Sequence, residues 1–168
     1  MHPADRDSRR SELLAAAVSF VRAVRAIPGV RQISLVGSIA TSRANPKDID
    51  FLIRITDDMD VAVLARHGRR LQGRAQQCNR GADIFLADER GQYLGRTCHW
   101  KECRPGVRMA CDARHCGRRP HLHDDLDDVA LSATVVAEPP VTLWPEVIRR
   151  VALPADVELM ITELQYAV

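Results

Sequence analysis

Apolar residues recur at three- and four-residue steps in two stretches of the chain, which predicts two amphipathic helices. The first stretch runs from Ser11 to Ile27 and ends at Pro28-Gly29, where a helix is expected to stop. The second runs from Asp58 to Cys78 and carries arginines at four-residue steps on its polar side. The predicted buried faces are Leu13, Ala17, Phe20, Val21, Val24 and Ile27 in the first helix, and Val61, Leu64, Leu71, Ala75 and Cys78 in the second.

Short β-rich segments alternate with these helices. Gln32 to Val36 and Ala82 to Ala87 are predicted strands. Ile49 to Ile55 alternates apolar and polar residues except at Leu52, which predicts a largely buried strand. Val129 to Val136 is also a predicted strand, whereas residues 96–123 show neither period. The order is therefore helix, strand, loop, strand, helix, strand, followed by an irregular segment.

Composition limits the class of protein. A chain of 168 residues with 46% apolar content fits one domain with its own core. Only 4% of the residues are aromatic, so stacking platforms for single-stranded nucleic acid are poorly supplied. The first ten residues alternate in charge, and an amphipathic stretch follows them, which indicates neither a signal peptide nor a membrane span. We expect a cytoplasmic protein that does not bind membranes.

Two aspartates on one predicted strand are the first candidate site. Side chains two apart in a strand share a face, so Asp48 and Asp50 point the same way while Ile49 points into the core. Such a pair repels itself unless divalent cations lie between the carboxylates, and hard oxygen ligands suit Mg²⁺ or Mn²⁺. Asp83, on the next strand, is the natural third carboxylate. The alternative is that the pair is merely the solvent face of a half-buried strand.

The segment before this pair favours the metal-site interpretation. Gly37-Ser38 follows a strand and offers backbone N–H groups and a hydroxyl to a phosphate chain. With the Asp48-Ile49-Asp50 strand and the later Asp83, it resembles the signature of the nucleotidyltransferase superfamily, the polymerase-beta-like fold, and in particular its minimal members. That signature is a Gly-Ser turn, about ten residues of loop, an Asp-x-Asp strand and a later single carboxylate. The resemblance covers about Ser11 to Ala87.

The resemblance implies an α+β fold, a small mixed sheet flanked by helices with catalytic groups at one edge. It also implies that Gly37 and Ser38 bind the nucleotide phosphates, that Asp48 and Asp50 hold two Mg²⁺ or Mn²⁺ ions, and that Asp83 completes the second metal site and orients the nucleophile. Many small members have Arg-Gly where this chain has Thr41-Ser42. The toxin–antitoxin members imply a cognate protein partner.

Four cysteines between residues 98 and 116 form a second candidate site. Cys98, Cys103, Cys111 and Cys116 are spaced Cys-x4-Cys-x7-Cys-x4-Cys, which indicates one structural, tetrahedral zinc site. His99, His115, His121 and His123 are alternative ligands, and reduced cysteines packed as small hydrophobes are the alternative without metal. Cys78 stands apart.

Residues 96–119 hold seven basic and two acidic side chains, a surface suited either to an RNA such as tRNA or to a protein partner, unless it is only a solvated loop. We expect three parts: a nucleotidyltransferase core (11–95), a zinc-binding segment (96–123) and a β-rich C-terminal extension packed on the core (124–168). The expected function is transfer of a nucleoside monophosphate from an NTP to a hydroxyl of RNA or protein. The alternative is a non-catalytic, zinc-stabilised module that binds nucleic acid or protein on the same scaffold.

Overall fold

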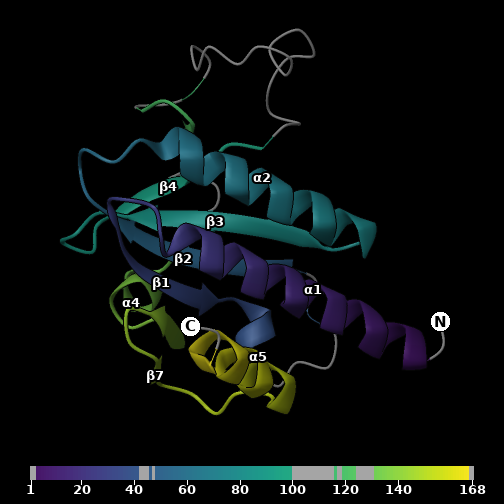
Figure 1. Ribbon diagram of the computed structural model, residues 1–168. Coiled ribbons are helices and arrows are strands. Elements are labelled where there is room, and N and C mark those ends of the chain that lie inside the picture. Colours follow the sequence, from purple (N-terminus) through teal and green to yellow (C-terminus); the bar gives the residue numbers. More distant parts are fainter. Residues whose placement is uncertain are drawn as a thin grey trace, which may run out of the picture.

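The computed structural model of the chain describes residues 3–41, 46, 48–99, 116, 119–123 and 131–166, with the backbone alone for residues 3–8. Within these ranges four helices flank a seven-stranded mixed sheet, so the fold is α+β (Figure 1). The elements in chain order are α1 (Pro3–Val24), β1 (Val30–Val36), the 3-10 turn η1 (Ser38–Ala40), β2 (Asp48–Ile55), α2 (Val61–Gln77), β3 (Gly81–Ala87), β4 (Tyr93–Thr97), β5 (Leu122–His123), α4 (Ala133–Ala137), β6 (Val141–Trp144), β7 (Ile148–Arg149) and α5 (Ala155–Tyr166).

The strand order in the sheet is β5-β4-β3-β2-β1-β6-β7. The pair β2 and β3 is parallel, with α2 as the crossover between the strands, and every other neighbouring pair is antiparallel. The predicted strands of the core therefore lie in the middle of the sheet. The flanking strands come from later parts of the chain.

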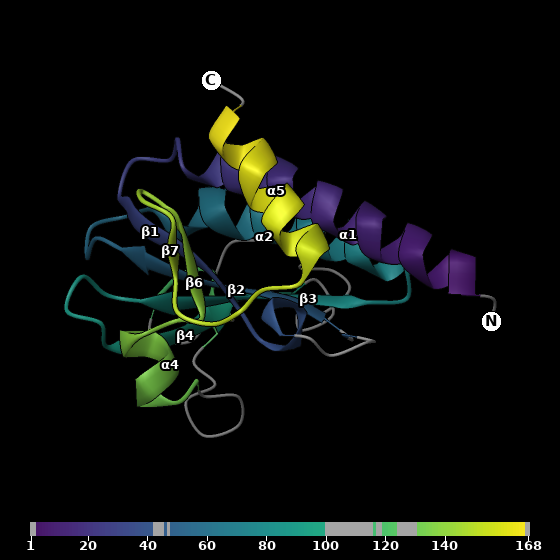
Figure 2. The same cartoon turned by 90° about the horizontal axis from the view of Figure 1, so that it is seen from below.

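The apolar side chains divide between the two faces of this sheet. Figure 2 shows α1, α2 and α5 on one face and the short α4 on the other. The main core lies under the three long helices and contains the inward-facing residues of the central strands: Ile33, Leu35, Ile49, Phe51, Ile53, Ile84 and Leu86. A smaller cluster on the other face contains Val36, Leu52, Phe85, Ala87 and Val136. Leu52 interrupts the alternation of β2 because α4 covers that end of the outer face.

The C-terminal segment belongs to this fold and is less β-rich than the sequence indicated. Strand β6 pairs with β1, and α5 contributes Val157 and Ile161 to the main core. The strand predicted from Val129 to Val136 is wrong for its described part, because Ala133–Ala137 is helical. Ser132 caps this helix by accepting a hydrogen bond from the Val135 N–H at 3.3 Å. Only one side of α4 packs against the sheet, so the β-branched residues of this short helix can pack there without forming a strand.

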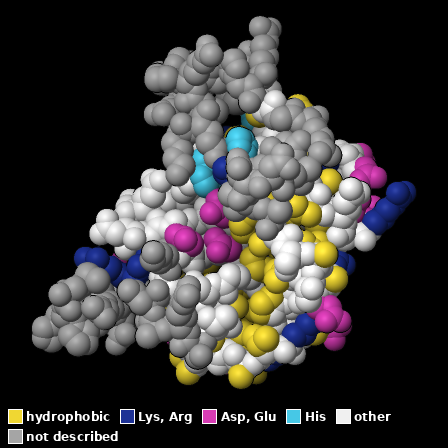
Figure 3. Space-filling model, turned by 180° about the vertical axis from the view of Figure 1, so that it is seen from behind, with side chains coloured by type: hydrophobic (Ala, Val, Ile, Leu, Met, Phe, Trp, Pro, Cys, Tyr) yellow, Lys and Arg dark blue, Asp and Glu magenta, His cyan; other side chains and the backbone are white. Residues whose placement is uncertain are grey.

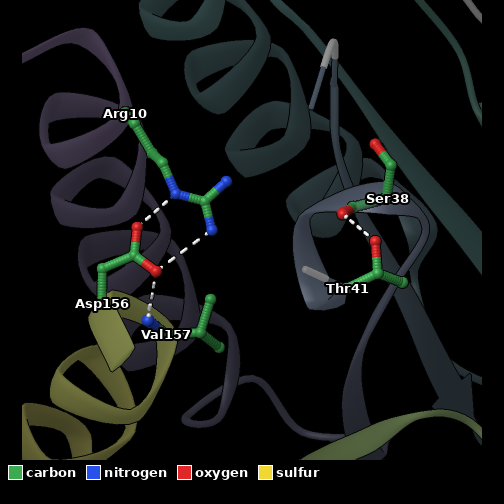
Figure 4. A network of polar contacts seen from close by, with 5 residues as sticks. All are labelled: Arg10, Ser38, Thr41, Asp156 and Val157. Carbon is green, nitrogen blue, oxygen red and sulfur yellow. Dashed lines mark hydrogen bonds and ion pairs between the residues drawn. The ribbon is translucent and has the colours of Figure 1, made fainter. Parts of the chain in front are cut away.

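An ion pair fastens the C-terminal helix to the first helix (Figure 4). The Arg10 guanidinium donates to both carboxylate oxygens of Asp156, one of them at 3.1 Å, and Asp156 also accepts from the Val157 N–H at 2.9 Å. The hydrogen bond from Arg10 is the first cause of the lowered pKa of Asp156. No helix in the described part of the chain is long and apolar enough to cross a membrane.

Candidate active site

Strand register brings three aspartates to one face of the sheet. Asp48 and Asp50 lie on β2 opposite in direction to the fully buried Ile49 and Phe51. The parallel pairing of β2 with β3 places Asp83 directly beside Asp50. These carboxylates therefore lie on the face away from α1 and α2, and the rear view in Figure 3 shows acidic side chains gathered beside histidine there.

Asp50 is the most perturbed member of this group. Its Oδ1 atom is buried, and no group within the described residues donates a hydrogen bond to it. Burial, followed by the negative charges of Asp83 and Asp48, raises the pKa of Asp50 from 3.8 to about 7, partly offset by a hydrogen bond from the backbone of Asp83. No positive side chain of a described residue is among the causes of this pKa, and a bound cation would supply a positive charge.

The turn that follows β1 lies against Asp50. Val36 pairs with Asp50 across the antiparallel strands, and Gly37 comes next with φ of +75°. A Cβ atom at Gly37 would lie 2.5 Å from Asp50 Oδ2, so only glycine lets the backbone approach the carboxylate this closely. The buried side chains of Ile39 and Ala40 hold the turn in the core.

Thr41 closes the turn from its far end. Its backbone N–H and its hydroxyl both donate to the Ser38 carbonyl, at 3.2 and 2.7 Å. Figure 4 shows that the Ser38 hydroxyl points away from Thr41. Thr41 thus stabilises the turn, and the next residue, Ser42, lies outside the described residues.

A second glycine approaches the other aspartate of the pair. The Gly81 N–H donates to Asp48 Oδ1 at 2.9 Å, and a Cβ atom at Gly81 would lie 2.4 Å from that oxygen. Gly37 and Gly81 therefore place backbone on both sides of the Asp48-x-Asp50 pair. Gly37 was predicted to be a site residue from the sequence. The contact between Gly81 and Asp48 could not be predicted, because it depends on the register between β2 and β3.

A glycine pair allows the contact at Asp50 to be measured. We expect Gly37→Ala to lower the free energy of unfolding by about 2–4 kcal/mol, because it adds both positive-φ strain and a clash with Asp50. Gly91→Ala is the matched control, since Gly91 has φ of +81° but its Cβ would meet nothing closer than 3.6 Å. It should cost about 1–2 kcal/mol through strain alone. Urea unfolding of both variants measures the difference, and equal losses would contradict a close Gly37–Asp50 contact.

His99 contacts the third aspartate. Its Nε2 atom lies 2.9 Å from Asp83 Oδ1, and the side chain is 10% exposed. The sequence marked His99 only as an alternative zinc ligand. Its neighbour in space is instead Asp83, because β4 runs antiparallel beside β3 and returns the chain to the start of β3. No spacing rule could have found this pair without the pairing of β3 and β4.

The structure brings part of the cysteine and histidine segment together. Cys98 Sγ lies 3.9 Å from His121 Nδ1 and accepts a hydrogen bond from Arg69 Nη1 at 3.2 Å. Cys116 Sγ accepts from the His121 N–H at 3.0 Å. His123 lies on β5, paired with Arg96. The remaining predicted ligands Cys103, Cys111 and His115 lie outside the described residues.

No group of three or more His, Cys, Asp or Glu side chains is close enough to hold a metal ion as the described part of the chain stands. This finding covers the three carboxylates but only the described members of the cysteine and histidine segment. At the carboxylates, Asp48 is bonded to the Gly81 backbone and Asp83 to His99, so a cation would have to draw these side chains toward Asp50.

Comparisons of the chain with protein-family models, with curated proteins and with solved structures gave no match. The resemblance to the nucleotidyltransferase superfamily therefore rests on the residues themselves: Gly37-Ser38, the Asp48/Asp50 pair and Asp83.

Proposed function

We propose that the chain is a divalent-metal-dependent nucleotidyltransferase of the polymerase-beta-like fold. In the proposed reaction an acceptor hydroxyl of RNA or protein attacks the α-phosphorus of an NTP. A new O–P bond forms, the bond between the α-phosphorus and the bridging oxygen breaks, and pyrophosphate leaves with the electron pair. The hydroxyl proton passes to a base or to water. The observation that carries this proposal is the buried Asp50 carboxylate held between Asp48 and Asp83 beside the Gly37 turn.

Asp48, Asp50 and Asp83 fit a Mg²⁺ or Mn²⁺ site better than they fit the solvent face of a half-buried strand. The negative charges of Asp83 and Asp48 add to burial in raising the pKa of Asp50, and Asp50 Oδ1 is buried with no donor from the described residues. Asp48, Asp50 and Asp83 would hold the metal. When bound, it would lower the pKa of the acceptor hydroxyl and neutralise charge on the leaving pyrophosphate.

The other residues have positioning roles in this proposal. Gly37 lets the turn approach Asp50 closely, and the Ser38 hydroxyl with the N–H groups of η1 would bind the triphosphate oxygens. His99 contacts one oxygen of Asp83 and would orient this carboxylate for the acceptor.

The test is transfer of label from α-labelled NTPs to cellular RNA or protein in the presence of Mg²⁺ or Mn²⁺. Transfer should require the divalent ion, disappear with EDTA, and fall when Asp48 and Asp50 are replaced. If no nucleotide transfers label to either acceptor pool, the chain is instead a non-catalytic module that binds nucleic acid or protein on this scaffold.

We also propose that the segment 96–123 binds one structural Zn²⁺, because Cys98 and Cys116 both contact His121 in the described structure. Zinc bound by thiolates in a closed site would hold the segment in place around His99, and therefore beside Asp83.

Freshly purified protein should therefore contain about one equivalent of zinc, measured by elemental analysis. Cys98→Ser should lose most of it. Cys78→Ser should retain it, because Cys78 is buried elsewhere and hydrogen-bonds to Glu12 at 3.3 Å. A content below about half an equivalent in the wild-type protein would argue against the site.

A further inference from the structure

A groove of about 460 Å³ runs between α1 and α2 on the face opposite the carboxylates. Its lining includes Ala16, Ser19, Phe20 and Ala23 from α1 and Leu71 and Gly73 from α2. Phe20 and Leu71 are buried and form an apolar floor, while a Cβ atom at Gly73 would meet nothing within 4 Å. Three of the α1 side chains are small and Gly73 has no side chain, so the helices leave a space between them.

The charged side chains that line this groove in the described part of the chain are all basic. Helix α2 holds four arginines and no acidic residue, and its His67, Arg70 and Arg74 line the groove. The α1 wall is neutral. Burial, and then the positive charges of Arg70 and Arg66, lower the pKa of His67. Arg70 and Arg74 form no ion pair with another described residue.

The dimensions favour a helix as the occupant. The α1 wall from Ala16 to Ala23 spans seven residue steps, or about 10 Å at the rise of an α-helix. Apolar side chains at positions i, i+4 and i+7 of a second helix cover the same length, which is the usual spacing of anchors in groove recognition. A nucleic-acid backbone would leave the Phe20 and Leu71 floor without a matching apolar surface.

We propose that this groove binds an acidic amphipathic helix of a partner protein, with apolar anchors on Phe20 and Leu71 and carboxylates facing Arg70 and Arg74. The site is independent of nucleotidyl transfer, because it lies on the other face of the sheet and shares no residue with the carboxylate site.

The probe is a fluorescein-labelled amphipathic peptide of about 15 residues, with leucines at i, i+4 and i+7 and glutamates flanking them. Binding to the full chain is followed by fluorescence anisotropy at physiological salt. We expect saturable binding, weakened at least tenfold by Arg70→Ala with Arg74→Ala and by Gly73→Leu, which fills the groove. Arg66→Ala is the control matched to Arg70→Ala alone: each removes one charge from an exposed position of α2, but Arg66 does not line the groove, so its replacement should change the affinity less than twofold.

Thermal melting and nucleotidyl transfer by each variant show whether the rest of the molecule is unchanged. Amide shifts in an NMR titration should concentrate in residues 16–23 and 67–77. The proposal is overturned if the glutamate peptide does not saturate, if a lysine version binds equally well, or if Gly73→Leu leaves the affinity unchanged. Preferential binding of an RNA oligonucleotide that is lost in the Arg70/Arg74 variant would assign the arginines to nucleic acid instead.

Discussion

Replacing both Asp48 and Asp50 by asparagine should lower nucleotidyl transfer by at least about a thousandfold, equivalent to about 4 kcal/mol of transition-state stabilisation. Asparagine keeps the size of each side chain and removes the charge. The lost charge is the one that would hold the divalent ion and, through it, the pyrophosphate leaving group. Asp83→Asn should reduce transfer less, because Asp83 shares its carboxylate with His99.

Asp57→Asn is the matched control for this experiment. Asp57 is an exposed carboxylate just beyond the opposite end of β2, and its replacement should leave transfer within a factor of two. Each variant is compared by initial rates at saturating NTP and Mg²⁺, after thermal melting has shown that it folds. Transfer by the Asp48/Asp50 double variant within tenfold of the wild type would exclude these carboxylates as the metal ligands.

The central part of the fold could be predicted from the sequence because its pattern is local. The predicted buried face of each helix is buried in the structure apart from the partly exposed Ile27, and Ile49, Phe51 and Ile53 point into the main core as their spacing in β2 indicated. The same two-residue period put Asp48 and Asp50 on one face. Helix α1 nevertheless begins at Pro3, before the predicted start at Ser11. The prediction missed these first turns because they lack an apolar stripe.

The remaining parts depend on which segments become neighbours. The pairing of Asp50 with Asp83 requires the parallel register of β2 and β3, and the contact between His99 and Asp83 requires β4 beside β3. A one-residue change of register would turn Asp83 to the other face, and no pattern within either strand excludes that change. The edge strands β5 and β7 are two residues long, too short to give a period at all.

The electrostatics of Asp50 predict how the stability of the metal-free protein depends on pH. A carboxyl group whose pKa rises from 3.8 in the unfolded chain to about 7 in the folded one binds its proton more tightly when folded. Its contribution to stability is therefore fully present below pH 3.8 and is lost as the pH rises to about 7. The ionised form costs the folded protein on the order of 4 kcal/mol at pH 8.

Asp50→Asn should remove this cost. In EDTA, we expect the variant to match the wild type near pH 4 and to exceed it at pH 8 by up to about 4 kcal/mol, or roughly 10 °C in Tm. Saturating Mg²⁺ should reverse the order at pH 8, because it stabilises the wild type and has no charged Asp50 to bind in the variant. Urea unfolding across this pH range, with Asp57→Asn as the control, measures both effects. If the difference between Asp50→Asn and the wild type did not change between pH 4 and pH 8, Asp50 would not be the strained carboxylate on which the metal site depends.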